Sequence, residues 1–143
     1  MRSYIRYPAS MPVALRLGDL VADETNYLNN VSRGGLSFNA IGPVPIDTLL
    51  DLRIPPNRPL FEILGKVVWC RQVGLHYTVG VEFVGTDPQM HGQLVAMACE
   101  IENFREAERA AGRLLSGQQA ALEWIARHGE RFVGDTTASL DKA

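Results

Sequence analysis

The chain has 143 residues, of which 46% are hydrophobic, which is enough for one compact domain with its own core. Its formal net charge of −2 argues against a general nucleic-acid binder. No apolar run approaches the roughly 18 residues of a membrane span, and the N-terminus lacks the apolar segment of a secretory signal, so we expect a cytoplasmic protein.

An extended arm and six short strands are predicted in the first part of the chain. Residues 1–11 show no clean periodicity, and Pro8 and Pro12 oppose regular structure, so this stretch is expected to be an arm. Alternating apolar residues and intervening turns predict strands at residues 13–17, 25–31, 35–40, 50–54, 61–69 and 77–83. Six short strands of this kind indicate a small antiparallel barrel.

The last two of these strands each have one apolar face. Phe61, Ile63, Val67 and Trp69 are predicted to share a face, and Gly65 between them is interpreted as a bulge or a bend. The apolar face of the last strand consists of Tyr77, Val79, Val81 and Phe83.

A first helix is predicted directly after the barrel. Asp87 followed by Pro88 favours a helix start, because aspartate is a good N-cap and proline a good first residue. Gly112 weakens the helix near its end. An apolar stripe at helical spacing is expected to pack on the barrel; it consists of Leu94, Met97, Ala98, Ile101 and Phe104.

A second helix is predicted from a capping box formed by Ser116 and Gln119. It runs to about His128, with Gly129 placed to end it. Its apolar side is predicted to comprise Ala121, Trp124, Ile125 and His128. We expect the barrel, its arm and the first helix within residues 1–112. The second helix and a frayed tail, residues 113–143, do not form a separate domain.

A polar ledge is predicted where the strand 25–31 ends. Asn30 and Ser32 are two residues apart, so both side chains point to the same side of an extended strand. Gly34 and Gly35 follow, and glycine permits a sharp turn or the close approach of a ligand. Two structural explanations compete with a binding role: the polar side chains close a turn, or the two glycines form a simple hairpin turn.

The order and spacing of two motifs resemble the PilZ domain family. Residues 2–6 read Arg-Ser-Tyr-Ile-Arg, and residues 30–35 read Asn-Val-Ser-Arg-Gly-Gly. They correspond to the RxxxR and [D/N]xSxxG motifs with which PilZ domains contact cyclic di-GMP. Residues 65–69 and 79–85 resemble the last two barrel strands, so the likeness spans about residues 2–86. It implies a mainly β fold, a six-stranded antiparallel split barrel followed by C-terminal helices, in a single-domain member of the family.

The resemblance also implies which side chains bind the ligand. They are Arg2, Arg6, Asn30, Ser32 and Gly35, with Arg33 as a further candidate for a phosphate contact. A guanidinium fits the O6 and N7 acceptors of guanine and neutralises phosphate, whereas an amide or a hydroxyl bonds base edges and phosphate oxygens. Gly35 is interpreted as a position where the ligand or the arm passes close to the backbone.

No enzymatic motif is present in the sequence. It contains no GxSxG, no GxxxxGK, no HExxH and no CxxC pattern, and its three histidines are scattered. Cys70 and Cys99 lack metal-like spacing and are read as small buried side chains. We expect a protein that binds cyclic di-GMP as its ligand and has no catalytic activity, metal or cofactor.

The expected function is that of a cyclic di-GMP receptor in bacterial second-messenger signalling. Ligand binding orders the arginine arm and signals to a protein of motility, pili or exopolysaccharide synthesis. The alternative is a structural adaptor of pilus or secretion machinery that needs no nucleotide, as in PilZ relatives without the arginine motif. Apolar surface on the C-terminal helices, including Met97, Ile101, Phe104 and Trp124, also suggests a homodimer.

Overall fold

A computed structural model describes residues 5–17, 20–21, 26–85 and 87–133. Its strands are β1 (Tyr7–Pro8), β2 (Pro12–Leu17), β3 (Leu20–Val21), β4 (Asn26–Val31), β5 (Gly35–Ala40), β6 (Leu49–Ile54), β7 (Phe61–Val73) and β8 (His76–Phe83). Three helical segments follow: α1 (Pro88–Ala110), α2 (Gly117–Trp124) and the π-helical turn η1 (Ile125–Gly129). Within these residues, no helix is both long enough and apolar enough to span a membrane.

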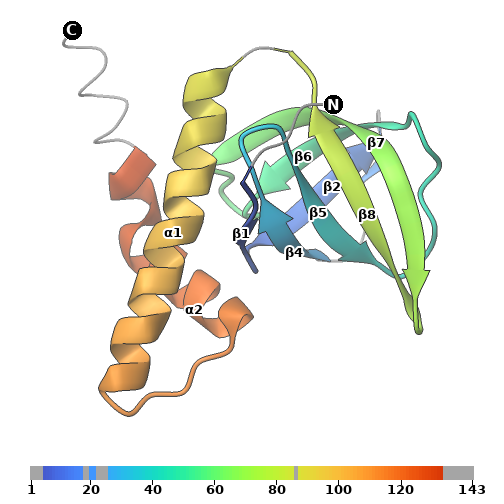
Figure 1. The fold of residues 1–143 in the computed structure, drawn as a ribbon. Coiled ribbons are helices and arrows are strands. Elements are labelled where there is room, and N and C mark those ends of the chain that lie inside the picture. Colours follow the sequence, from blue (N-terminus) through green and yellow to red (C-terminus); the bar gives the residue numbers. More distant parts are fainter. Residues whose placement is uncertain (1–4, 18–19, 22–25, 86, 134–143) are drawn as a thin grey trace, which may run out of the picture.

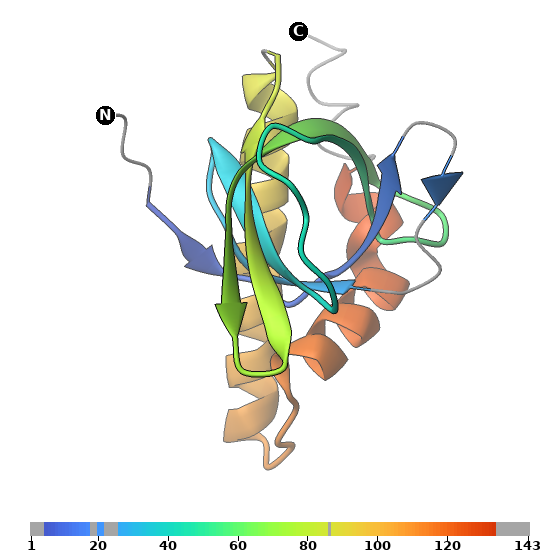
Figure 2. The same cartoon turned by 90° about the vertical axis from the view of Figure 1, so that its right-hand side faces the viewer.

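Six antiparallel strands close into a barrel, as predicted. The strand order is β1-β4-β5-β8-β7-β6-β2-β3, and the additional pairing of β2 with β4 closes the ring. The two-residue strands β1 and β3 lie outside the ring, beside β4 and β2. Helices α1 and α2 lie together on one side of the barrel (Figure 1). They are behind the barrel when the view is turned by 90° (Figure 2).

The core lies inside the barrel and beneath α1. Alternation along the strands buries one side chain in two, and residues such as Val13, Phe38 and Leu52 have no exposed surface. The predicted stripe of α1 covers the barrel, because Leu94, Met97, Ala98 and Ile101 are all buried. Phe104 is partly buried against the same core. The prediction that this helix packs on the barrel is therefore confirmed.

Trp69 faces the outside of the barrel, so the prediction that it shares a face with Val67 is wrong. Val67 pairs with Val81, whereas Trp69 pairs with Gly80, and the register shifts at Val68 between them. One extra residue in a strand reverses the alternation of the side chains that follow it. Val67 is therefore buried in the core, while Trp69 is half-buried on the outer surface.

The bulge predicted at Gly65 is absent, because Gly65 pairs in regular register with Leu50 and with Phe83. A Cβ atom at this position would overlap the side chain of Val81. The glycine thus makes room for a core side chain of the neighbouring strand, and the strand distortion falls at Val68 instead.

Both helix starts follow the predicted caps. The Asp87 carboxylate accepts a hydrogen bond from the Met90 N–H at 3.1 Å. At α2 the capping box is complete: Ser116 Oγ accepts from the Gln119 N–H, and Gln119 Oε1 accepts from the Ser116 N–H. Gly112 follows the end of α1 with φ +94°, a left-handed conformation that glycine adopts without strain.

The predicted end of the second helix at Gly129 is wrong. The chain passes through the wider π-helical turn of η1 and remains helical to residue 133. The wider turn places Gly129, five residues after Trp124, on the buried face. A Cβ at Gly129 would lie 2.8 Å from Leu60 Cδ1, so the glycine permits close packing on the loop before β7. His128, predicted on the apolar side, is exposed.

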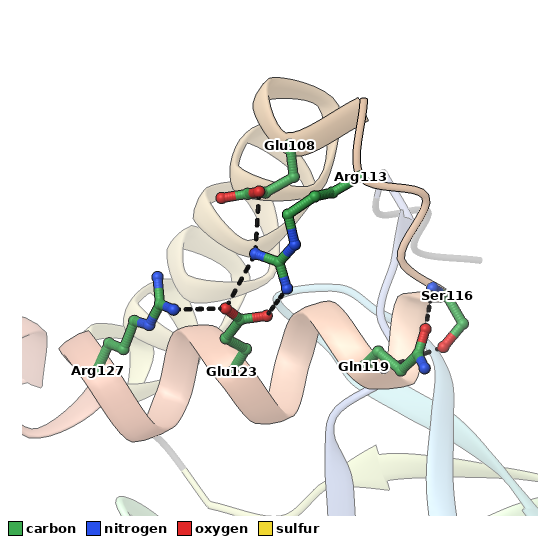
Figure 3. Close-up of polar contacts among 6 residues, drawn as sticks. All are labelled: Glu108, Arg113, Ser116, Gln119, Glu123 and Arg127. Atoms are coloured by element: carbon green, nitrogen blue, oxygen red, sulfur yellow. Dashed lines mark hydrogen bonds and ion pairs between the residues drawn. The ribbon is translucent and has the colours of Figure 1, made fainter. Parts of the chain in front are cut away.

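An ion cluster joins the end of α1 to α2 (Figure 3). Arg113 donates to Glu108 at 3.0 Å and to both carboxylate oxygens of Glu123 at 3.2 and 3.0 Å, and Arg127 pairs with Glu123 at 2.7 Å. Hydrogen bonding from Arg113 lowers the pKa of Glu123, and hydrogen bonding to Glu123 raises the pKa of Arg113. The buried face of α2, which includes Ala120, Ala121 and Trp124, belongs to the same core as the barrel.

Candidate functional site

A cleft of about 900 Å³ lies on the outer surface of the barrel. Its walls come from the turn between β4 and β5, the outer faces of β7 and β8, and the first turn of α1. Charged and aromatic side chains from all of these walls reach it: Arg6, Arg33, Trp69, Glu82, Phe83, Asp87 and His91. The volume is within the range of small-molecule sites, roughly 300–1,000 Å³.

Ser32 holds the turn that forms one wall of the cleft. Its hydroxyl accepts hydrogen bonds from the N–H groups of Gly34 and Gly35 and donates to the carbonyl of Gly35, each at 3.2 Å. Its own N–H donates to the same carbonyl at 2.8 Å. Ser32 is buried. Its hydrogen bonds close the turn, which is one of the two structural explanations given for this stretch in the sequence analysis. The structure therefore gives the cleft a rigid edge at this turn.

Gly35 is required by the packing of two strands rather than by space for the arm. A Cβ at this position would overlap the carbonyl oxygen of Val81 on β8. Gly35 lines the cleft, and its backbone is bonded to Ser32. The close approach predicted from this glycine exists, but its partner within the described residues is the β8 backbone.

The two motifs meet in space, although 24 residues separate Arg6 from Asn30. The Nη1 atom of Arg6 donates a hydrogen bond to Asn30 Oδ1 at 2.7 Å. The arm is held there because β1 pairs with β4, Tyr7 opposite Val31 and Pro8 opposite Asn30. The predicted extended arm of residues 1–11 is thus paired with β4 at Tyr7 and Pro8. Arg2 lies outside the described residues.

The predicted site residues contribute to the cleft in different ways. Arg6, Ser32, Arg33 and Gly35 line it, and Arg33 is exposed. Asn30 joins the site as the hydrogen-bond acceptor of Arg6.

Sequence reasoning missed the far walls of the cleft, because it did not place Trp69, Glu82 or His91 among the site residues. The indole of Trp69 lies over Gly80, where a Cβ would overlap the ring, and the Arg71 guanidinium carbon is 5.3 Å from the ring centroid. The signal for Trp69 was a glycine in the middle of a strand, which often marks a close approach.

The cleft is lined by equal numbers of positive and negative side chains and by one buried histidine. Arg6 and Arg33 oppose Glu82 and Asp87 among its lining residues. His91 is only 7% exposed and packs against Phe83, with 4.4 Å between the ring centroids. Burial lowers the pKa of His91, and the nearby Asp87 carboxylate partly opposes this shift. The imidazole is therefore mostly neutral near pH 7.

The chain resembles known proteins in sequence and in fold. The family model described as PilZ domain matches residues 1–98. Among solved structures, the PilZ domain of YcgR from Escherichia coli with c-di-GMP is 19% identical, with a TM-score of 0.56, 79% of this chain covered and 98% of that one. No curated protein matches the chain.

Two longer proteins share the fold as well. The inhibitor of motility MotI/DgrA from Bacillus subtilis is 16% identical, with a TM-score of 0.56, and the match covers 72% of this chain and 52% of that one. For YcgR from Escherichia coli in complex with c-di-GMP the values are 16% identity, a TM-score of 0.60, and coverage of 78% and 50%. The chain thus spans about half the length of these two proteins. At such identities, the likeness establishes the fold alone.

Proposed function

Because the chain belongs to the PilZ domain family, we propose that it is a receptor that binds cyclic di-GMP in the cleft beside Arg6 and signals to a protein partner. The observation that carries this proposal is the 2.7 Å hydrogen bond from Arg6 to Asn30, which brings the arginine motif and the Asn-x-Ser-x-x-Gly motif together at the edge of the cleft. Solved PilZ structures of similar fold contain this ligand.

The chemistry of the cleft suits a molecule with two guanines and two phosphates. Arg6 uses one of its five N–H donors on Asn30 and keeps the others for a guanine edge or a phosphate. Arg33 adds a second guanidinium, and Trp69 adds an aromatic surface. Purines stack on aromatic rings and on guanidinium groups. We assign binding to Arg2, Arg6, Asn30, Arg33 and Trp69, without catalysis. Ser32 and Gly35 are assigned to the turn at the edge of the cleft, since the Ser32 hydroxyl is fully used by its three hydrogen bonds.

We expect cyclic di-GMP to bind the purified chain in titration calorimetry. GTP and GMP are expected to bind far more weakly, because neither presents two guanines on one compact ring. Equal affinity for GMP would contradict recognition of the dinucleotide. If no heat accompanies cyclic di-GMP at any concentration, the receptor proposal is wrong and the nucleotide-independent adaptor becomes the better explanation.

Ordering of the arm is the proposed signal, and it is confined to the residues before Tyr7, because β1 already pairs with β4. Arg2 and Arg6 would both contact the ligand and thereby fix the backbone between them. Fixing each residue costs roughly 1–2 kcal/mol of conformational entropy, so a short arm keeps the cost low. The fixed arm would present Ile5, which is 73% exposed, to the partner protein.

Hydrogen exchange measures this ordering. We expect the amides of residues 3–6 to gain protection on addition of cyclic di-GMP. The amides of residues 61–67 are expected to change little, since they belong to the closed barrel and precede the cleft-lining end of β7. No gain at residues 3–6 under saturating ligand would refute the ordering, even where calorimetry shows binding.

The proposal does not include a homodimer through the C-terminal helices. The apolar residues that suggested one are used within a single chain: Met97 is fully buried, Ile101 is 4% exposed and Trp124 is 6% exposed. Phe104, the fourth of these residues, is partly buried against the same core. Most of the surface that prompted the expectation is thus covered within one chain, and the homodimer stays a prediction.

A further inference from the structure

His91 is a buried titratable side chain that also lines the cleft. Only 7% of its surface is exposed, and it lies in the first turns of α1. It lines the same cleft as Arg6 and Ser32. One side of the imidazole rests on the Phe83 ring at 4.4 Å. Within the part of the chain that the structure describes, no side-chain hydrogen bond to the imidazole is found, and His91 is among the residues that line the cleft.

The charged groups around His91 come from every wall of the cleft. Asp87 lies one helical turn before it, and Glu82 of β8 lies next to Phe83 in sequence. The positive charges are Arg6 of the arm and Arg33 of the β4–β5 turn. These four groups sum to no net formal charge, so a ligand with two negative charges is not fully neutralised by them. A proton on His91 would supply part of the missing positive charge.

We propose that His91 takes up a proton when the dianionic ligand enters the cleft, so that ligand affinity increases as pH falls. This inference rests on the proposed function, since it concerns the same cleft. In the free protein, burial lowers the pKa of the imidazole and so favours its neutral form, and the Asp87 carboxylate partly opposes this shift. Two phosphates beside the ring favour the imidazolium, and Phe83 provides an aromatic face that tolerates a cation.

The direction of the effect follows from proton linkage. The free protein has a His91 pKa below the ordinary 6.5, and an anionic ligand raises it in the complex. Affinity therefore begins to rise as pH falls through the pKa of the complex, and it levels off below the pKa of the free protein. Each unit by which the ligand raises this pKa corresponds to about a tenfold gain in affinity. Carboxyl groups ordinarily titrate near 4, and phosphodiesters stay ionised, so neither changes charge between pH 6 and 8. A variant at His91 then separates this histidine from the other two in the chain.

Calorimetry with cyclic di-GMP in two buffers of different ionisation enthalpy tests the proposal. Between pH 8 and pH 6 we expect the Kd of the unmodified chain to fall at least about threefold, with fractional proton uptake shown by the difference in heat between buffers. His91→Phe keeps a ring on Phe83 but cannot titrate, so its Kd is expected to be independent of pH, with no proton uptake. His128→Gln is the matched control, because His128 is exposed on η1, and it is expected to retain the full pH dependence.

The outcomes separate the inference from the proposed function. Binding with the same Kd across the window and equal heats in both buffers overturns the role of His91 and leaves the receptor intact. Absence of binding at every pH overturns the receptor itself. If His91→Phe does not fold, the imidazole resonance of the unmodified chain is titrated by NMR with and without ligand. An unchanged pKa of His91 would then refute the inference, and an increase would support it.

Discussion

Gly35→Ala is expected to lower the free energy of unfolding by about 2–3 kcal/mol, the cost typical of overpacking in a rigid interior. The added Cβ would overlap the carbonyl oxygen of Val81, and backbone atoms of a closed barrel cannot move aside as a flexible side chain can. Strand β5 pairs with β8 directly at this position, Gly35 opposite Glu82. Such a loss is a large share of the roughly 5–15 kcal/mol that stabilises a typical domain.

Urea denaturation measures the free energy of unfolding of Gly35→Ala, with Gly42→Ala as the control variant. Gly42 has no atom within 4 Å of its ideal Cβ position and lies in an exposed loop, so the same added methyl group is expected to be neutral or slightly stabilising there. Equal unfolding midpoints for the two variants would show that β5 and β8 do not press together at Gly35.

Arg6→Ala is expected to weaken cyclic di-GMP binding at least tenfold, which corresponds to about 1.4 kcal/mol. The variant removes a guanidinium that Asn30 holds at the edge of the cleft through a 2.7 Å hydrogen bond. A good paired contact between arginine and guanine is worth about 1–3 kcal/mol, so loss of one contact accounts for the effect. The measurement is the dissociation constant by calorimetry at fixed salt and pH.

Two further variants separate specific contact from general charge. Arg109→Ala removes the same charge from the far end of α1, where the guanidinium is 68% exposed and pairs with Glu106, and it is expected to bind normally. Arg6→Lys keeps the charge but loses the planar, paired donors, so most of the affinity is expected to be lost. Equal weakening by Arg6→Ala and Arg109→Ala would contradict a direct contact. Full affinity in Arg6→Lys would show that Arg6 contributes only its positive charge and not a paired hydrogen bond.

The sequence alone was sufficient for the features that depend on local periodicity and on caps. Alternation predicted the six barrel strands, and Asp87 and Ser116 marked the helix starts that the hydrogen bonds confirm. These features are encoded by residues within a few positions of one another, so no long-range information is needed to read them. The two sequence motifs could be recognised in the same way, and their order along the chain indicated the family that the family model confirms.

Only the tertiary structure decided which side chains share the cleft. Trp69 reaches the outer surface because one extra residue at Val68 shifts the β7–β8 register, and a local pattern does not reveal where such a shift falls. Only glycine fits at position 35, because a Cβ there would overlap the carbonyl oxygen of Val81. Val81 is distant in sequence and becomes a neighbour only when β5 pairs with β8. His91 joins Arg6 because α1 starts beside the turn after β4. Strand register and helix docking bring distant residues together, and these depend on the packing of the whole chain rather than on any one segment.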